Sequence, residues 1–337
     1  MSASVRVVGV AEMSDHELLE VYELDRALHE EAWADDPFRS WPAFLAAQRA
    51  PRPHMHIARA LARRDGSLAG VAWIGWRIGL ENRHLARIDM GVRADRRRSG
   101  TGRLLLRAAA EHAHQDGRTL MQSWTSSRVP AGDAFAAALG AEARSTSHEN
   151  RLALADVDRA LLERWVGAGE ALPDYELVFV DGVTPPELLE AAAEVNNVMN
   201  TAPRDDLDEE DETITPEALA AGERAHIAGG HRVWHLYARH RPSGKFAGFT
   251  AIGWEPDQPH VIGQADTGVD PAHRGQGLGK WLKAKMLLKI VDEIPGARTV
   301  VTGNAMSNDA MLGINYALGF RPAGSWTTWE LETAKVL

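Results

Sequence analysis

The spacing of apolar residues changes along the chain between a pattern typical of helices and one typical of strands. Residues 278–290 carry apolar side chains at every fourth position, which places them on one face of an α-helix. Residues 68–78 form a short, nearly continuous apolar run that follows Asp65-Gly66. A run of this kind beside a tight-turn dipeptide indicates strands joined in a hairpin.

The same interpretation of the whole chain predicts a mixed α/β protein in which most strands form antiparallel hairpins. Helices are expected over residues 15–30, 40–49, 102–114, 133–139, 156–167, 186–199, 216–228, 279–291 and 308–318. Strands are expected over residues 5–10, 56–63, 68–78, 85–92, 119–124, 144–154, 175–180, 233–239, 246–254, 261–269, 299–302 and 324–331. The second half of the chain repeats the order of the first.

One glycine-containing motif occurs twice and shows that this repetition is a duplication. Its first copy runs from Asp89 to Gly102 and its second from Asp266 to Gly279, 177 positions later. Both copies read Asp-x-Gly-Val, then four residues, then Arg-x-x-Gly-x-Gly. Apolar segments before the motif and a Leu-Gly pair after it match at nearly the same offset. We therefore expect two tandem domains of roughly 150–180 residues: residues 1–167, a linker at 168–174, and residues 175–337.

Composition narrows the class of protein further. The chain has 337 residues, 45% of them hydrophobic and 25% charged, which is typical of globular domains. It contains no cysteine, which excludes disulfides, thiolate nucleophiles and cysteine-ligated metals, and its histidines show no metal-binding spacing. A net charge of −10 argues against nucleic-acid binding. With no signal-peptide pattern and no apolar run of about 20 residues, we expect a cytoplasmic protein without a membrane partner, either a monomer or a homodimer.

Each motif copy joins a predicted strand to a predicted helix through glycines. A strand that stops, turns through glycines and opens a helix directs several unpaired backbone N–H groups at one spot. These donors and the positive end of the helix dipole form a cradle for phosphate. The sequence therefore predicts two phosphate-binding loops, one in each half.

These residues resemble the GNAT N-acetyltransferase superfamily, whose signature is Arg/Gln-x-x-Gly-x-Gly/Ala after a strand that ends in a hydrophobic residue. The second copy fits closely, including Pro271 two positions after Val269, whereas the first has Ala94 at the position of the proline. The tandem layout is similar to that of the mycothiol synthase family. The resemblance implies two GNAT-like domains, each a mixed, mostly antiparallel sheet flanked by helices.

The resemblance also implies acetyl-CoA as cosubstrate, with its pyrophosphate on the loop and its pantetheine beside the strand that ends at Val269. The residues that this assigns to acetyl-CoA in the second half are Val269, Arg274, Gly275, Gln276, Gly277, Leu278, Gly279, Lys280, Asn304, Asn308 and Asn315. The corresponding residues in the first half are Val92, Arg97, Arg98, Ser99, Gly100, Thr101, Gly102 and Arg103. Close approach of the backbone is the role expected for the glycines.

Catalytic residues are harder to assign, because the chain departs from the family at the positions that often carry a base. These positions hold Ala265 and Gly263 in the second half, which cannot accept a proton. The nearest candidate base is Asp266, which could equally cap the loop through backbone hydrogen bonds. Tyr316 is the candidate acid for the leaving thiolate, although it lies one residue beyond the usual position and could instead be a packed aromatic.

The second half is expected to be the catalytic one, since the matching stretch of the first half has no asparagines. The first could have kept its fold without its role. Residues 205–212 hold seven acidic side chains and could attract a cationic substrate or be a solvated loop, while Trp73, Trp76 and Trp254 are expected in the core. The leading hypothesis is acetyl transfer to a primary amine of a small molecule, an antibiotic or a metabolite. The alternatives are a peptide or protein amine as acceptor, or an inactive acyl-CoA sensor.

Overall fold

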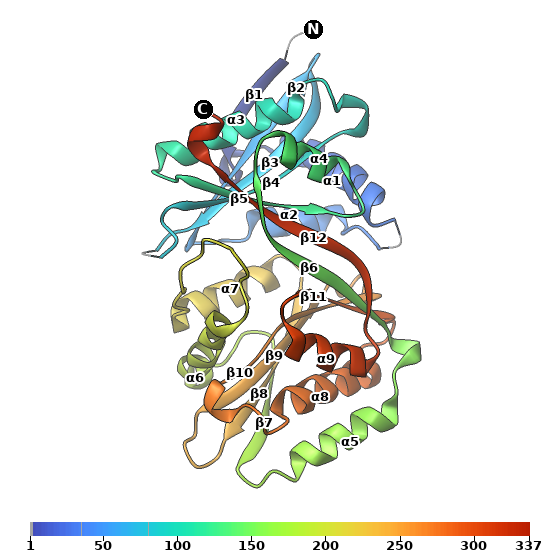
Figure 1. Ribbon diagram of the computed structural model, residues 1–337. Coiled ribbons are helices and arrows are strands. Elements are labelled where there is room, and N and C mark those ends of the chain that lie inside the picture. The colour runs from blue at the N-terminus through green and yellow to red at the C-terminus, as the bar shows by residue number, and fades with distance from the viewer. Residues whose placement is uncertain (1–2, 35, 80) are drawn as a thin grey trace. The chain divides into compact units, whose positions relative to one another are not determined.

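A computed structural model describes residues 3–34, 36–79 and 81–337 (Figure 1). Its α-helices are α1 (Asp15–Ala32), α2 (Trp41–Arg49), α3 (Thr101–Gln115), α4 (Ala131–Ala138), α5 (Arg159–Glu170), α6 (Pro186–Asn196), α7 (Pro216–Ala228), α8 (Leu278–Glu293) and α9 (Asp309–Leu318). Its strands are β1 (Ala3–Gly9), β2 (Met55–Arg64), β3 (Ser67–Arg77), β4 (Leu85–Val92), β5 (Leu120–Ser126), β6 (Glu142–Ala153), β7 (Tyr175–Asp181), β8 (Arg232–His240), β9 (Phe246–Trp254), β10 (Val261–Val269), β11 (Thr299–Ala305) and β12 (Arg321–Glu332). The α/β class and the repeated order of elements agree with the prediction.

The chain folds into two compact units that do not coincide with the two sequence repeats. Unit 1 comprises residues 1–146, 204–210 and 325–337, and unit 2 comprises residues 147–203 and 211–324. Each unit therefore takes its last strand from the other repeat. The sequence repeat fixes which strands exist, but their pairing partners are distant in the chain and cannot be deduced from it.

The sheet of unit 1 follows the order β1-β2-β3-β4-β5-β12. Antiparallel pairs join β1 to β2, β2 to β3 and β3 to β4, whereas β4 and β5 are parallel. The C-terminal strand completes this sheet, because Trp326–Glu332 of β12 pair antiparallel with β5. The sheet is thus mixed and mostly antiparallel, as expected.

The sheet of unit 2 has the equivalent order β6-β11-β10-β9-β8-β7. Here β10 and β11 form the parallel pair, whereas β6–β11, β10–β9, β9–β8 and β8–β7 are antiparallel. Ser147–Ala153 of β6, which the sequence repeat assigns to the first half, pair with β11. Both sheets therefore place one parallel pair between antiparallel strands.

Two hydrophobic clusters in unit 1 cover opposite faces of its sheet. Helix α3 packs its buried side chains, among them Leu105 and Ala109, against Ile74 and Ile88 of the strands. On the other face α1 and α2 contribute Leu18, Val21 and Phe44 to a cluster with Leu61 and Val71. Because successive strand residues point to opposite faces, both faces of these central strands are buried. The result is a helix–sheet–helix sandwich.

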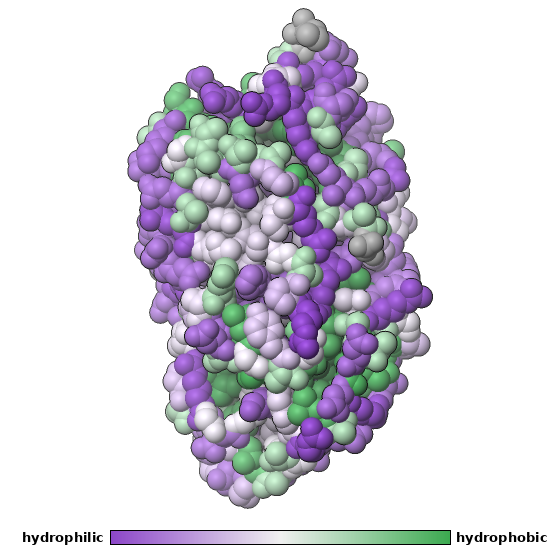
Figure 2. All heavy atoms as spheres, turned by 45° about the vertical axis from the view of Figure 1, so that its right-hand side comes forward, coloured by the Kyte–Doolittle hydropathy of each residue, from purple (hydrophilic) through white to green (hydrophobic). Residues whose placement is uncertain are grey.

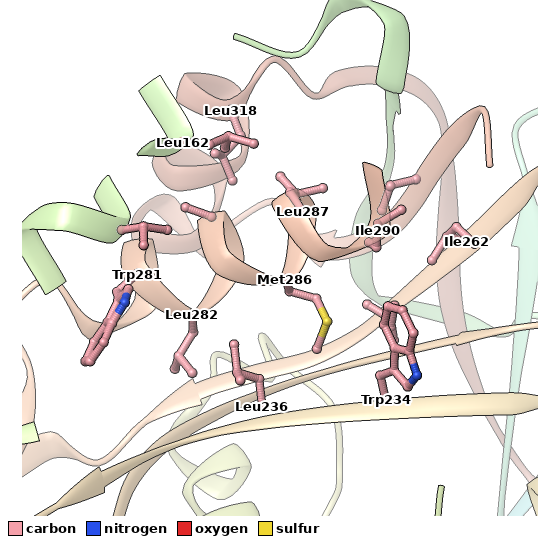
Figure 3. Close-up of a cluster of buried hydrophobic side chains, with 14 of the residues drawn as sticks. Leu162, Trp234, Leu236, Ile262, Trp281, Leu282, Met286, Leu287, Ile290 and Leu318 are labelled. Carbon is pink, nitrogen blue, oxygen red and sulfur yellow. The ribbon is translucent and has the colours of Figure 1, made fainter. Parts of the chain in front are cut away.

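In unit 2, helix α8 has the role that α3 has in unit 1 (Figure 3). Its residues Leu282 and Met286 lie over Leu236 and Trp234 of β8. The other face is covered by α6, where Ala192 and Val195 pack against Tyr237 and Phe249 in a separate cluster. The apolar residues at every fourth position, which predicted a helix over residues 278–290, thus form the buried face of α8.

Helix α5 belongs to unit 2, although the sequence repeat places it in residues 1–167. It buries Leu162 and Val166 against α8 and α9 in the main core of the unit. Gly169 allows this approach, since a Cβ there would collide with the ring of Trp281. The helix ends at Glu170, inside the stretch expected to be the linker at 168–174.

The surface shown in Figure 2 intersperses hydrophilic and hydrophobic groups. Among the described residues, no helix is long and apolar enough to span a bilayer.

Candidate acyl-transfer site

A gap opens between the two parallel strands of each unit. In unit 2 the parallel pairing of β10 with β11 extends from Val261 to Gly263 and then ends. In unit 1 the pairing of β4 with β5 likewise ends at Arg87. Backbone groups beyond these points lack their ladder partners on that side, so an extended ligand can bond to them as an added strand would.

A β-bulge at this gap distinguishes unit 2 from unit 1. Gln264 pairs with Ile252 and Thr267 with Thr250, so that Ala265 and Asp266 together face a single residue of β9. The matching β3–β4 pair keeps one register from Gly70 to Gly75. A bulge leaves the extra residue unpaired and redirects its side chain. The bulge follows Gly263, where the pairing of β10 with β11 has already ended, so Ala265 and Asp266 lie along the gap.

The loop after β10 forms the predicted cradle at the start of α8. Gly275 has a φ of 80° and Gly277 a φ of 84°, and no side chain caps the helix. A side chain would strain this left-handed backbone, although nothing in the chain itself would touch a Cβ at either glycine. Conformation rather than internal crowding requires these two glycines. The first-turn N–H groups, from Leu278 to Lys280, are left for a ligand.

The side chain of Arg274 is directed back into the fold. Its Nε donates to the carbonyl of Val269 at 3.0 Å, and its Nη2 donates to Thr201 Oγ1. The resemblance assigned Arg274 to acetyl-CoA, and this assignment stays a prediction, but the side chain is engaged with the protein itself. The guanidinium instead fixes the turn that presents the backbone amides.

The loop of unit 1 has the same backbone course but a different chemical environment. Gly100 caps α3 with a φ of 83°, whereas Arg98 occupies the position of Gly275 with a φ of 58°. Arg97 repeats the bond to the carbonyl of the preceding strand, at 3.1 Å from Val92, and forms an ion pair with Glu31.

A second arginine reaches the unit 1 loop from β2. Arg64 donates to the carbonyl of Ser99 and, at 2.8 Å, to Thr101 Oγ1. Thr101 is buried, and its hydroxyl is hydrogen-bonded to the hydroxyl of Ser99. The Ser99 hydroxyl also bonds to the carbonyl of Arg96 in the loop. The guanidinium of Arg64 therefore already occupies the unit 1 cradle. Gly102 and Arg103 lie in the first turn of α3, as the corresponding residues of a phosphate loop do.

The two motif aspartates lie in protein-lined recesses. Desolvation by the surrounding protein raises the pKa of Asp266 above its ordinary value, although the residue is still exposed to solvent. The carboxyl is therefore enclosed on several sides but remains reachable. Burial likewise raises the pKa of Asp89, partly offset by Arg59. A raised carboxylate pKa favours proton uptake near neutral pH.

The three predicted asparagines do not have one common role. Asn315 is fully buried on α9 and donates from Nδ2 to Asn304 Oδ1 on β11 at 2.7 Å. Asn308 caps α9 by accepting from the N–H of Met311. Asn304 and Asn315 thus lie together, and Asn315 Oδ1 has no hydrogen-bond partner.

Tyr316, the predicted acid, lies on the outer face of α9. It is 39% exposed, whereas Leu312, Asn315 and Leu318 form the buried stripe of the helix. The position that the family often fills with tyrosine is therefore occupied by a buried amide, with the tyrosine one residue further round the helix.

A buried polar network in unit 2 had no assigned role from the sequence. Glu223 on α7 accepts from the backbone N–H and the hydroxyl of Thr184, each at 2.7 Å, and lies 3.4 Å from His235 Nε2. Burial lowers the pKa of His235 and raises the pKa of Tyr237 to about 12. Glu223 lies three residues after the buried Ala220, within the buried stripe of α7, and this was the signal in the sequence.

A second cluster that was not predicted lies in unit 1. Asp25 projects from α1 into the electrostatic range of Arg59 and Asp89, and burial raises its pKa to about 6. Arg59 on β2 is 8% exposed and lies directly across from Trp73, which in turn lies across from Asp89. The signal was an acidic residue that interrupts the apolar stripe of a helix.

Unit 1 also contains a cavity of about 440 Å³ where β4 and β5 part. Four tryptophans dominate its wall. The lining residues are Trp33, Trp73, Arg87, Ile88, Gln122, Ser123, Trp124, Trp326 and Thr328. Trp73 was expected in the core and instead lines this cavity, whereas Trp76 and Trp254 are buried as expected.

Most of the acidic segment is held against unit 1. The backbone and side chain of Asn82 exchange hydrogen bonds with Glu210, and Arg87 pairs with Glu209 at 3.1 Å. Ser145 donates to Asp205. These contacts favour a structural role for this part of the segment over the expected alternative of a freely solvated loop.

Comparison with known proteins decides the family. The profile of the acetyltransferase (GNAT) family matches residues 18–141 and again residues 196–320. The chain belongs to the acetyltransferase (GNAT) family. It is an N-acetyltransferase of the tandem type, and the GNAT family generally uses acetyl-CoA as its cosubstrate.

Solved structures support the tandem architecture. A tandem GNAT protein from the clavulanic acid biosynthesis pathway, solved without AcCoA, has 26% sequence identity and a TM-score of 0.80, covering 98% of this chain and 99% of that chain. A GCN5-related N-acetyltransferase from Sphaerobacter thermophilus shares the fold at 14% identity and a TM-score of 0.66, covering 98% of this chain and 96% of that one. No curated protein sequence matches the chain significantly.

Proposed function

We propose that this GNAT protein transfers an acetyl group from acetyl-CoA to a primary amine of a small molecule, and that unit 2 performs the transfer. The observation that carries the proposal is the uncapped glycine turn at the start of α8, next to a strand gap that also contains a bulge. In unit 1 the gap has no such bulge. Unit 2 therefore combines a phosphate cradle with open backbone groups at one place.

The residues of unit 2 fit the chemical parts of acetyl-CoA. The backbone N–H groups of 276–280 would hold the pyrophosphate at the helix N-terminus. The backbone groups along the free edge of β10, up to Val269, would form hydrogen bonds with the amide groups of pantetheine, as they would with a neighbouring strand. Asn304 lies beside the same gap on β11. The thioester supplies an activated acetyl group.

Asp266 is the residue proposed to receive the proton of the attacking amine, directly or through water. Its raised pKa suits a base that must take a proton and release it again near neutral pH. A backbone N–H at the bulge would stabilise the negative charge that develops on the carbonyl oxygen. Tyr316, on the solvent side of α9, is retained only as a candidate acid for the thiolate.

The acceptor is proposed to be a small molecule because the similar tandem protein is described as part of the clavulanic acid biosynthesis pathway. A peptide amine and an inactive acyl-CoA sensor are the alternatives. We would follow thiol release from acetyl-CoA with the full chain and a panel of small primary amines, amino acids and short peptides. We expect release with at least one small amine and little with peptides.

The same assay identifies the alternatives. Thiol release with peptides alone would contradict a small-molecule acceptor. Binding of acetyl-CoA in calorimetry without release for any amine would indicate a sensor. Absence of both binding and release would contradict the proposal itself.

A further inference from the structure

The tryptophan cavity of unit 1 lies on the sheet face covered by α1 and α2. Met121 and Leu331 point toward α3, so their strand neighbours Gln122 and Glu330 point to the opposite face. Trp73 belongs to that second face, because it lies two residues after Val71 on the same strand, and Val71 packs in the α1–α2 cluster. The cavity therefore lies mainly on the face opposite α3, although Ile88, which packs against α3, also contributes to its wall.

The cavity has the size and lining of a small-molecule site. Its volume of about 440 Å³ is within the 300–1,000 Å³ that is typical of ligand pockets. Indole rings provide flat apolar walls that favour stacking against another ring. Trp124 is 47% exposed although it is large and apolar, which leaves a stacking surface uncovered.

Beside these indoles is an arginine whose bonding capacity is incompletely used. Arg59 is 8% exposed, it donates to Gln48 at 3.3 Å, and its buried Nε has no hydrogen-bond partner. A buried donor without a partner is costly. Asp25 and Asp89 interact electrostatically with Arg59, but neither accepts a hydrogen bond from its Nε.

Arg52 adds a second positive charge at the same place. Partial burial and the nearby guanidiniums of Arg39 and Arg59 lower its pKa. Asp25 and Asp89 offset two of the three positive charges of Arg39, Arg52 and Arg59, which leaves one positive charge for a bound anion. Arg59 is the cross-strand partner of Trp73, so the positive cluster and the aromatic cavity are adjacent.

We propose that unit 1 binds a small carboxylate with an aromatic or other flat apolar body, whose ring enters the tryptophan cavity while Arg59 and Arg52 hold its carboxylate. A carboxylate accepts two hydrogen bonds in the fork geometry that guanidinium groups present. The body of the ligand removes the exposed faces of Trp124 and Trp73 from water. This site lies outside the unit 2 machinery and does not depend on the proposed acetyl transfer.

Three probes with the same ring and chain length separate the possible charges of the ligand. Calorimetry of the full chain, without coenzyme A, would compare 3-phenylpropionate, 3-phenylpropan-1-ol and 3-phenylpropylamine. We expect the carboxylate to bind at least about 10-fold more tightly than the alcohol, since hydrogen bonds to charged groups are worth roughly 1.5–3 kcal/mol. Equal or tighter binding of the alcohol or the amine would overturn the proposal, as would no binding of any probe at 10 mM.

Substitutions locate the two parts of the site. Trp124→Ala should weaken the carboxylate and the alcohol alike, by about 5–10-fold for the loss of one aromatic contact. Arg59→Gln should weaken the carboxylate by about 10-fold and leave the alcohol unchanged, and Arg52→Gln should act in the same direction. Arg52 is a surface residue that its neighbours enclose only in part, so that variant remains informative if Arg59→Gln does not fold.

Phe179→Ala is the matched control, because Phe179 is an aromatic residue of unit 2 with 38% exposure. It should bind all three probes like the unmodified chain. If it weakened binding as much as Trp124→Ala, the probes would be binding to exposed aromatics in general and the assignment would fail. Unchanged carboxylate affinity in both arginine variants would also overturn it.

Discussion

The two glycine loops share a backbone course but differ in what surrounds it. In unit 2 both left-handed positions are glycines and the start of the helix is open, whereas in unit 1 Arg98 takes one of them and Arg64 bonds to the turn. The buttressing contact differs too: Arg274 reaches a threonine hydroxyl, and Arg97 reaches the carboxylate of Glu31. A duplicated loop can thus keep its geometry while its charge changes.

The strands that lead into the two loops also differ, in the regularity of their pairing. Unit 2 has the bulge at Ala265–Asp266, and unit 1 has a regular strand beside a large aromatic cavity. The bulge lies along a gap with open backbone groups, whereas the cavity has four indole rings in its wall. The two copies therefore present different surfaces to a ligand at equivalent places in the fold.

Buried charge is distributed differently as well. Lys283 of α8 is 1% exposed, and its counterpart in α3, one motif repeat earlier, is the buried Leu106. On the other sheet face, Leu28 packs over Gly91 and Val198 over Gly268. By this correspondence, the buried Val195 of unit 2 holds the position that Asp25 holds in unit 1. Each unit therefore has an ionisable group where the other has an aliphatic one.

The largest predicted difference concerns the two motif aspartates. Asp266→Asn should reduce kcat by a factor on the order of 10²–10⁴, the usual contribution of a general base, while Asp89→Asn should change kcat less than threefold. Steady-state kinetics with the best amine from the panel measures both. An unchanged kcat in Asp266→Asn would remove that residue from the mechanism, and a large loss in Asp89→Asn would move the chemistry to unit 1.

Replacing the buried lysine should stabilise unit 2. Burial lowers the pKa of Lys283 to about 7 from an ordinary value of 10.5, so the folded state binds the proton less tightly than the unfolded state. Stability should rise from pH 7 toward 10.5 and be lowest below pH 7. Lys283→Leu should remove this penalty and add about 2–4 kcal/mol at pH 6. Calorimetric melting at pH 6 and 9 tests it, and a lower Tm at both pH values would contradict it.

The cradle glycines provide a direct comparison of the loops. Gly277→Val places a branched side chain at a φ of 84° and should weaken acetyl-CoA binding in unit 2, with turnover falling on the order of 10²-fold for a cost of about 2–3 kcal/mol. Gly100→Val should have less than a threefold effect on turnover. Gly244→Val is the control, since its φ of 72° lies in a hairpin turn. Equal losses in the first two variants would show that both loops serve the reaction.

The smallest predicted effect concerns Asp25. Its pKa is raised to about 6 from 3.8, so the folded state favours the protonated carboxyl, and stability should decrease as the pH rises from about 4 to 6. Asp25→Asn should therefore stabilise unit 1 by about 1–2 kcal/mol at pH 7.5 and by much less at pH 4. Thermal melting at the two pH values measures the difference. A stabilisation of equal size at both would contradict the assignment.

Local features of the sequence predicted the repeat, the element order and both loops. The glycine turns follow from residue type alone, because few other residues adopt a φ near 80°. Asp25 was missed although the sequence marks it, since it lies where Leu18, Val21 and Leu28 would otherwise continue one apolar stripe. A polar residue within such a stripe is the signal to follow.

The features that the sequence did not disclose depend on contacts between distant residues. Trp73 looks like a core residue because it alternates with apolar neighbours, yet whether its face is filled depends on how β4 and β5 diverge. The bulge at Asp266 likewise depends on the register of β10 against β9. No local spacing specifies either quantity.

The exchange of final strands has a consequence for cutting the gene. A fragment that stops at residue 324 would lose the part of β12 that pairs with the edge of β5, although all of residues 1–146 would still be present. The bare edge of β5 would expose unpaired backbone groups and invite self-association. Neither repeat expressed alone should therefore be a soluble, self-sufficient protein, and two fragments divided near residue 172 should recover activity only when they are produced together.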